Sequence, residues 1–237
     1  MIEGPFRNFR PLAAAFSYFS ILPIPHSDEP PSEDAIALLP LVGVIIGVFA
    51  GLGGYGSWLL TQSSIAAAIV AWVLSIALSG AIHVDGFLDC CDGLFATASP
   101  QRRLEIMRDP RHGTYAIVGM AMISMLWLYA LAQIPAVLLL VVLPLAAIFA
   151  RCGALLVRRP SVIVLGAVAG VLAAIDAPSH RFGVLGAVVL AILVAAAVEA
   201  FARRRLGGML SGDCYGAAIV VTEVALLLAF PALLLLR

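Results

Sequence analysis

Long apolar stretches recur along this 237-residue chain, and they constrain its fold more than any other feature. A helix of about 18 or more apolar residues is long enough to cross the hydrocarbon core of a bilayer. Hydrophobic residues make up 62% of the chain and charged residues 12%, which excludes an ordinary soluble domain. The sequence therefore predicts an all-α, polytopic membrane helix bundle that forms one domain, residues 1–237. We place about seven transmembrane helices near residues 38–60, 65–82, 114–133, 136–157, 161–176, 182–201 and 214–236.

The first 37 residues do not fit this pattern. The apolar run between Pro11 and Pro25 is too short to span a bilayer, and an acidic segment follows it. We therefore expect residues 1–37 to form a cytoplasmic segment that is interfacial or re-entrant. Within this segment, Ser32 is placed to cap a short helix that contains Asp34.

The charged residues orient the chain in the membrane. All 14 basic residues are arginines, and with a cytoplasmic N-terminus only Arg181 and Arg237 lie on the opposite side. Because cytoplasmic segments of membrane proteins carry an excess of basic residues, the asymmetry places the charged connecting segments in the cytoplasm. The formal net charge is zero, so nothing in the composition indicates a nucleic-acid partner.

Three aspartates, Asp85, Asp89 and Asp92, directly follow the second apolar stretch. Their spacing of i, i+4 and i+7 puts all three carboxylates on one face of a helix. Such a stripe repels itself at neutral pH unless protons or a cation neutralise it. Mg²⁺ binds one or two carboxylates together with phosphate oxygens, so it suits this face. The pattern indicates a metal-assisted enzyme of phosphoryl-group chemistry, with residues 83–113 as a cytoplasmic catalytic segment.

A charged segment follows, in which Glu105 and Asp109 are four residues apart. We expect them to form a second carboxylate pair on one helical face before Pro110 ends the helix. Arg108 and Arg111 flank this pair and are suited to bind phosphate oxygens in a bidentate manner. The alternative is an ordinary solvated loop with salt bridges and lipid-headgroup contacts.

A glycine-rich turn near the C-terminus follows three consecutive arginines and contains Gly208, Gly212 and Asp213. Glycine-rich turns that lead into a helix N-terminus are suited to anion binding. The alternative is a positively charged helix end followed by a flexible turn. Two further carboxylates, Glu199 and Glu223, fall within the last two apolar stretches, where such groups are usually functional or paired.

The four cysteines add little to this picture, because Cys90 and Cys91 are adjacent and no C-x-x-C pair exists. A zinc site formed by His83, Cys90 and Cys91 is one interpretation. On a helix, however, the two cysteines lie on the side opposite the aspartates. This arrangement favours a packing role.

Two joined motifs in the centre of the chain resemble a known family. Residues 83–93 read HVDGFLDCCDG and residues 104–115 read LEIMRDPRHGTY. They closely resemble the signature of cobalamin synthases, also called adenosylcobinamide-GDP ribazoletransferases, which reads H-x-D-G-x-x-D-x-x-D-G and then L-E-I-M-K-D-S-R-x-G-x-Y/F. The similarity extends to residues 22–25, 39–43 and 207–217, so it covers essentially the whole chain.

Several positions depart from the family pattern, the first being Ile21, where the family often has arginine before its L-P-V-P. Arg108 stands in place of lysine, Pro110 in place of serine, and the C-terminal turn is one residue longer, with Ser211 in place of threonine. These departures affect the expected role of the C-terminal turn and leave the central aspartates unchanged.

The resemblance implies a Mg²⁺-dependent transferase of late cobalamin biosynthesis. Enzymes of this family transfer the adenosylcobinamide-phosphate moiety of adenosylcobinamide-GDP to α-ribazole or its 5′-phosphate, which gives adenosylcobalamin or its phosphate and GMP. The residues that match the motifs are Asp85, Asp89 and Asp92 as catalytic metal ligands, His83 as a candidate general base, and Glu105, Arg108, Asp109, Arg111, Gly113, Gly208, Gly212 and Asp213 as substrate and phosphate ligands. On a continuous helix, His83 would point away from the aspartates.

The resemblance also implies a setting and partners. We expect a multi-pass protein of a bacterial or archaeal plasma (inner) membrane whose active site faces the cytoplasm. The expected partners are the two substrates and the lipid bilayer. A homo-oligomer is compatible with small residues such as those of Gly51–Gly54, which allow helices to pack closely within or between protomers.

Two other functions share some of these features. A CDP-alcohol phosphotransferase would begin its signature as Asp89–Ala96 does, but Thr97 stands where that family has arginine. A cation transporter would use carboxylates as an ion path at mid-bilayer. The acidic residues of this chain cluster instead in cytoplasmic segments, and no internal repeat is apparent.

Overall fold

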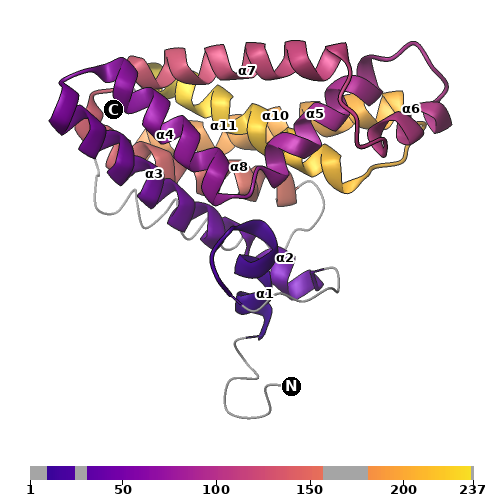
Figure 1. Ribbon diagram of the computed structural model, residues 1–237, viewed down its shortest axis with the longest axis horizontal. Coiled ribbons are helices and arrows are strands. Elements are labelled where there is room, and N and C mark those ends of the chain that lie inside the picture. Colours follow the sequence, from indigo (N-terminus) through magenta and orange to yellow (C-terminus); the bar gives the residue numbers. More distant parts are fainter. Residues whose placement is uncertain (1–9, 25–30, 157–180, 236–237) are drawn as a thin grey trace.

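The described part of the chain is entirely helical. The computed structural model describes residues 10–24, 31–156 and 181–235, and no strand occurs in these ranges. In chain order the helices are α1 (Arg10–Phe19), α2 (Glu33–Ala37), α3 (Leu39–Thr61), α4 (Ser64–Leu78), α5 (Ile82–Phe95), α6 (Pro100–Met107), α7 (Thr114–Ala132), the 3₁₀ turn η2 (Ala136–Leu138), α8 (Leu139–Leu156), α10 (Arg181–Arg205) and α11 (Gly212–Leu235) (Figure 1).

Five helical segments in these ranges are long and apolar enough to cross a membrane. They are Leu39–Thr61, Thr114–Ala132, Ala136–Leu156, Gly183–Arg205 and Gly212–Leu233. Large apolar side chains such as Leu60, Met125 and Leu193 are exposed on them, as expected for surfaces that face lipid. The prediction of an all-α, multi-pass membrane protein is therefore confirmed.

The count of seven transmembrane helices is not confirmed. The stretch predicted at residues 161–176 lies outside the described residues. The stretch predicted at 65–82 forms only the 15 residues of α4 and then bends by 90° into α5, so it counts as a sixth span only if both helices are taken together. The break could not be predicted from hydropathy, because Gly80 and Ala81 are not polar and do not interrupt the apolar stretch.

The α4–α5 break sets the direction of α5. Gly80 has φ +61° and Ala81 has φ +58°, and a left-handed conformation is uncommon for a residue with a Cβ atom. The hydroxyl of Ser79 donates a hydrogen bond to the Ile76 carbonyl at 2.9 Å, and the amide of Asp85 donates to the Ala81 carbonyl at 2.8 Å. The Ser79 hydrogen bond lies at the C-terminal end of α4, and the Asp85 hydrogen bond is in the first turn of α5.

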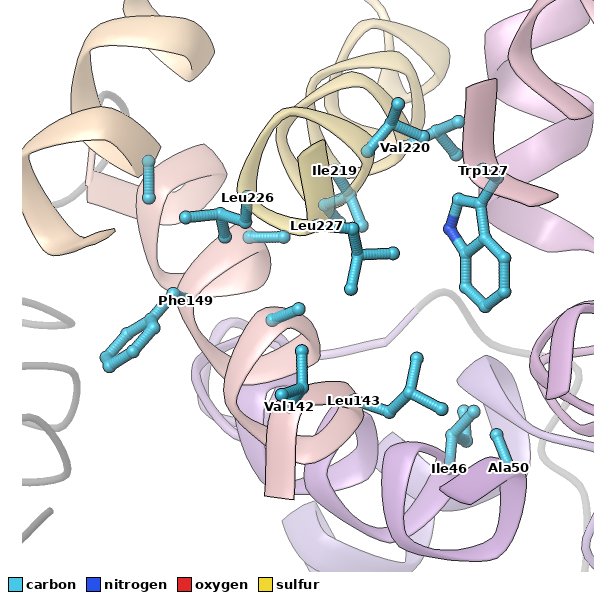
Figure 2. Close-up of a cluster of buried hydrophobic side chains, with 14 of the residues drawn as sticks. Ile46, Ala50, Trp127, Val142, Leu143, Phe149, Ile219, Val220, Leu226 and Leu227 are labelled. Carbon is cyan, nitrogen blue, oxygen red and sulfur yellow. The ribbon is translucent and has the colours of Figure 1, made fainter. Parts of the chain in front are cut away.

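The core of the bundle lies around α8, which packs on α3, α10 and α11. Figure 2 shows side chains from α3, α7, α8 and α11 meeting there, with Ile46, Trp127, Leu143 and Leu227 buried among them. Small residues let these helices approach closely: a Cβ atom on Gly47 would lie 2.7 Å from the Cα atom of Pro144 in α8.

The glycines of the run Gly51–Gly54 also serve packing inside the protomer. A Cβ atom on Gly51 would lie 2.6 Å from the Leu139 carbonyl oxygen, and one on Gly54 would lie 3.0 Å from the Ala67 carbonyl oxygen. The close approach that we considered for an oligomer is therefore used by α8 and α4 of the same chain.

The N-terminal helices pack on the rest of the chain below the bundle in Figure 1. Helix α1 has ten residues, and Ile21 after it donates a backbone hydrogen bond to the Leu78 carbonyl at 3.0 Å. The Ser32 hydroxyl accepts a hydrogen bond from the Ala35 amide at 3.3 Å and caps α2, as predicted. A ten-residue helix is too short to span a bilayer.

Candidate active site

The carboxylates predicted on one helical face are carried by α5, at the end of the bundle where α6 lies (Figure 1). Asp85 is exposed, with 65% of its side chain accessible, whereas Asp89 keeps only 16% accessible. The imidazole of His112, from the loop before α7, lies between them: Nε2 is 3.7 Å from Asp85 Oδ1, and Nδ1 is 3.8 Å from Asp89 Oδ1. The structure thus brings Asp85 and Asp89 together beneath His112.

A third carboxylate, Asp213, joins this group from the first turn of α11. Glycines permit the approach: a Cβ atom on Gly86 would lie 2.9 Å from the Asp213 Cα atom, and one on Gly216 would lie 3.0 Å from the His83 carbonyl oxygen. Asp89 is subject to electrostatic repulsion from both Asp85 and Asp213. We call Asp85, Asp89 and Asp213 the carboxylate cluster.

Asp92 makes different contacts from its two neighbours on α5. It is buried, and its carboxylate accepts hydrogen bonds from the backbone amides of Gly113, at 2.5 Å, and Ala116, at 3.0 Å. A carboxylate at this point satisfies free amides in the first turn of α7 and interacts favourably with the helix dipole. Gly113 serves the same contact, since a Cβ atom there would lie 2.9 Å from Asp92 Oδ1. Asp92 therefore differs from Asp85 and Asp89 in its surroundings, and the shared metal-binding role of the three aspartates stays a prediction.

Replacing Asp92 with alanine is expected to destabilise the protein by about 1–3 kcal/mol, because the buried amide of Ala116 and the partly buried amide of Gly113 lose their acceptor. Asp92→Asn retains one acceptor oxygen and is expected to lose less stability than Asp92→Ala. Thermal unfolding of both purified variants in detergent measures the difference. An unchanged midpoint for Asp92→Ala would show that the cap contributes nothing.

The loop after α6 corrects one prediction. Helix α6 ends at Met107, so Glu105 and Asp109 do not share a helical face. Glu105 instead forms an exposed ion pair with Arg102 at 2.8 Å. Asp109 accepts two hydrogen bonds from the Arg111 guanidinium, at 2.7 and 2.9 Å, and one from the backbone amide of Arg111. The hydrogen bonds from the Arg111 side chain are the main reason, and the one from its backbone amide the second, why the pKa of Asp109 is lowered to about 2.

The two predicted phosphate-binding arginines are placed differently by this loop. Arg111 is exposed but its guanidinium is held by Asp109. Arg108 is exposed at the C-terminal cap of α6 and is close enough to Asp213 to attract its carboxylate. Of these two arginines, Arg108 is therefore the one whose charge acts on a member of the carboxylate cluster.

The C-terminal glycine-rich turn connects α10 to α11. Gly207 has φ +64° and Gly208 has φ +92°, the left-handed backbone that favours glycine, and Gly212 begins α11 just before Asp213. The arginines before this turn bind protein groups: Arg203 pairs with Glu199 at 2.6 Å, and Arg205 donates to the Leu94 carbonyl at 2.7 Å. Glu199 is thus one of the paired carboxylates that burial near a membrane favours.

Two arginines, Arg103 and Arg205, make contacts at this end of the molecule that the sequence did not indicate. Arg103 donates to the carbonyls of Ala96, at 3.2 Å, and Arg205, at 3.0 Å, while Arg205 donates to Leu94 and Ala96 at the end of α5. Cationic side chains at a helix C-terminus complement its dipole. We call this pair the arginine clasp.

His83 and the cysteines are buried, whereas Asp85 of the carboxylate cluster is exposed. His83 is 7% exposed, its ring stacks against Phe19 with centroids 6.1 Å apart, and it faces the interior of the bundle. The Sγ atoms of Cys90 and Cys214 are 4.0 Å apart, and all four cysteines are free and buried. In the described ranges, no three or more His, Cys, Asp or Glu side chains converge tightly enough to hold a metal ion on their own.

His112 is the residue of the site that sequence reasoning missed. It occupies a position that the resembled signature leaves variable, and it is 20 residues or more from the aspartates in the chain. Only the return of the loop from α6 to α7 brings it over α5. No local signal identifies such a contact.

The fold and this site define a class: a multi-pass helical membrane protein with carboxylates and arginines gathered at one end of its bundle. A family model described as cobalamin-5-phosphate synthase matches residues 11–231. The chain belongs to this family and is a transferase of cobalamin biosynthesis.

Curated relatives agree with the family model. Proteins named adenosylcobinamide-GDP ribazoletransferase include one from Deinococcus radiodurans, 35% identical over 93% of this chain and 85% of its own length. Others come from Vibrio parahaemolyticus, 33% identical over 92% of this chain and 90% of the relative, and Synechococcus elongatus, 30% identical over 92% and 95%. No solved structure matches the chain.

Proposed function

We propose that this protein transfers the adenosylcobinamide-phosphate moiety of adenosylcobinamide-GDP to α-ribazole or its 5′-phosphate, with Mg²⁺ as cofactor. The ribazole hydroxyl attacks the phosphorus joined to cobinamide and loses its proton. The phosphorus–oxygen bond to the guanylyl phosphate breaks, and GMP leaves. The observation that supports this reaction best is the carboxylate cluster beside exposed Arg108, in a chain whose relatives carry this activity in their names.

The carboxylate cluster fits Mg²⁺ in the chemistry of its donors. Hard oxygen ligands suit this ion, and it usually binds one or two carboxylates with substrate phosphates rather than a complete protein cage. Asp85 and Asp89 both lie near His112, and the negative charges of Asp85 and Asp213 repel that of Asp89. A cation bound there would relieve this repulsion. When bound, Mg²⁺ supplies charge neutralisation for a diphosphate.

Protein groups supply the positioning. Transfers of this kind depend on orientation and electrostatics more than on covalent chemistry. Exposed Arg108, whose charge acts on Asp213, is proposed to bind phosphate oxygens, and Asp109 holds the guanidinium of Arg111 by two hydrogen bonds. His83 faces the bundle interior, so we assign it no proton transfer with the substrate.

The site is proposed to face the cytoplasm of a bacterial or archaeal plasma membrane. Arg102 and Arg103 lie in α6, and Arg108 and Arg111 follow it. Arg203–Arg205 end α10 at the same end of the bundle. A concentration of arginines on one side of a membrane protein marks the cytoplasmic side. Soluble, charged substrates would reach the carboxylate cluster from there.

The direct test is GMP release by the detergent-purified protein. With adenosylcobinamide-GDP, α-ribazole 5′-phosphate and Mg²⁺, we expect stoichiometric GMP and a cobalamin product, measured by chromatography and mass spectrometry. Excess EDTA is expected to stop the release, and added Mg²⁺ to restore it, because without a cation the charge of the substrate's diphosphate is not neutralised as GMP leaves.

The same assay separates the alternatives. Activity that persists in EDTA and resists further metal removal would refute the Mg²⁺ dependence while retaining the transfer. Folded protein that releases no GMP would refute the transfer. CDP-alcohol substrates, scored by CMP release, serve as the comparison reaction.

A further inference from the structure

A small cavity with a mixed lining, apolar over most of its surface and polar at one group of side chains, lies inside the bundle beside the α4–α5 break. It has a volume of about 30 Å³, and its polar lining is formed by Ser75, Ser79, His83, Arg151 and Glu223, from α4, α5, α8 and α11. The indoles of Trp72 and Trp127, 4.6 Å apart, help to enclose it. Its volume accommodates about two water molecules. A buried water needs two to four polar partners, and these five side chains can supply them.

Two buried nitrogens on this lining lack a hydrogen-bond partner. Nε2 of His83 and Nε of Arg151 have none within the described part of the chain. The residues are 7% and 3% exposed, so bulk water does not reach them. A buried polar atom left without a partner costs free energy, so such atoms normally bind protein groups or ordered water.

The rest of the Arg151 side chain is firmly placed. Its Nη1 donates to the Ala147 carbonyl at 3.0 Å and lies 3.6 Å from Glu223 Oε2. Gly43 of α3 makes room for it, since a Cβ atom there would lie 2.5 Å from Arg151 Cδ. Guanidinium has five N–H donors, so these two contacts leave donors directed elsewhere.

We propose that the cavity is an internal water-binding site, and that its water links His83 to the Arg151–Glu223 ion pair and thereby positions α5. His83 belongs to the first turn of α5, two residues before Asp85. The N-cap of α5 is Ala81, which makes no side-chain cap, and α5 runs at 90° to α4. A water-mediated bond from α5 to α8 and α11 fixes this turn.

As positioning residues, His83, Arg151 and Glu223 act on the reaction through the carboxylates of α5. This part of the inference rests on the proposed transfer reaction, whereas the water site itself does not. A displacement of about 1 Å in a catalytic group can lower turnover by about a hundredfold. We therefore expect loss of the network to lower kcat and to leave the KM values for the substrates nearly unchanged.

The test replaces both members of the ion pair with apolar residues, in the variant R151M/E223L. Exchange of a buried ion pair for apolar side chains commonly leaves stability unchanged or raises it. We expect the unfolding midpoint to be retained, kcat to fall about a hundredfold, and KM for both substrates to stay within twofold. The backbone amides of residues 82–86 should exchange with deuterium about fivefold faster, the effect of one lost net hydrogen bond.

Two further variants make the result decisive. Gly43→Ala displaces the Arg151 side chain without removing its charge, and it should lower kcat in the same direction if R151M/E223L fails to fold. Thr222→Val is the matched control: Thr222 is next to Glu223, fully buried and also unpartnered at Oγ1 within the described residues, but it does not line the cavity. It should retain wild-type kcat and exchange rates.

The outcomes separate the two proposals. Wild-type protein without GMP release refutes the proposed function, and deuterium exchange then still tests the network. Folded R151M/E223L with wild-type kcat and wild-type exchange overturns the positioning role. An experimental map that resolves other interior waters but shows none between His83 and Arg151 overturns the water site.

Discussion

Replacing Asp89 with asparagine is expected to lower turnover by about a thousandfold, which matches the loss of several kcal/mol of charge stabilisation. Asp89 is the inner member of the carboxylate cluster, 16% exposed and facing His112 together with Asp85. Asparagine has the same shape but no charge. Because Asp89 is repelled by Asp85 and Asp213, the variant should unfold at the wild-type temperature or above it.

Asp34→Asn is the matched control for this experiment. Asp34 is an exposed carboxylate in the first turn of α2, away from the carboxylate cluster, and the chemical change is identical. It should retain wild-type GMP release and Mg²⁺ dependence. Full Mg²⁺-dependent activity of Asp89→Asn would remove the carboxylate cluster from the reaction.

The second large effect is expected at Gly86, which is replaced with alanine. The added Cβ atom would lie 2.9 Å from the Asp213 Cα atom and 3.0 Å from its carbonyl oxygen, and backbone atoms cannot move aside as a flexible side chain can. Overpacking of this kind costs about 1–3 kcal/mol. It also separates Asp213 from Asp85 and Asp89, so GMP release should fall about a hundredfold.

Gly56→Ala provides the comparison. Gly56 lies inside α3, where an added Cβ atom would meet nothing within 4 Å. Alanine there should raise stability by about 0.5–1 kcal/mol, since glycine is unfavourable within a helix. Thermal unfolding in detergent, followed by circular dichroism, measures both variants. A wild-type midpoint and activity for Gly86→Ala would show that α5 and α11 do not meet closely.

Local patterns were sufficient to predict much of the fold. The length of the apolar stretches predicted helices that span a membrane, because the bilayer sets a minimum length that composition reveals. Ser32 was predicted to cap a short helix and does so. The i, i+4 spacing of Asp85 and Asp89 predicted a shared face, since helical periodicity alone decides it.

Contacts between distant segments were not predictable in the same way. Asp92 has the periodicity of its neighbours, yet its carboxylate is used by amides at residues 113 and 116, which only the tertiary fold brings to it. The approach of Gly86 to Asp213 also joins residues far apart in the chain. A single sequence reveals which residues share a helical face, but not which segment packs against that face.

The arginine clasp has a consequence for sequence variation. Its acceptors are backbone oxygens of Leu94, Ala96 and Arg205, and every residue type offers such an oxygen. Replacing Ala96 therefore leaves the acceptor in place, whereas inserting or deleting a residue between α5 and α6 would move it out of register. We infer that this connection tolerates changes in its amino acids far better than changes in its length.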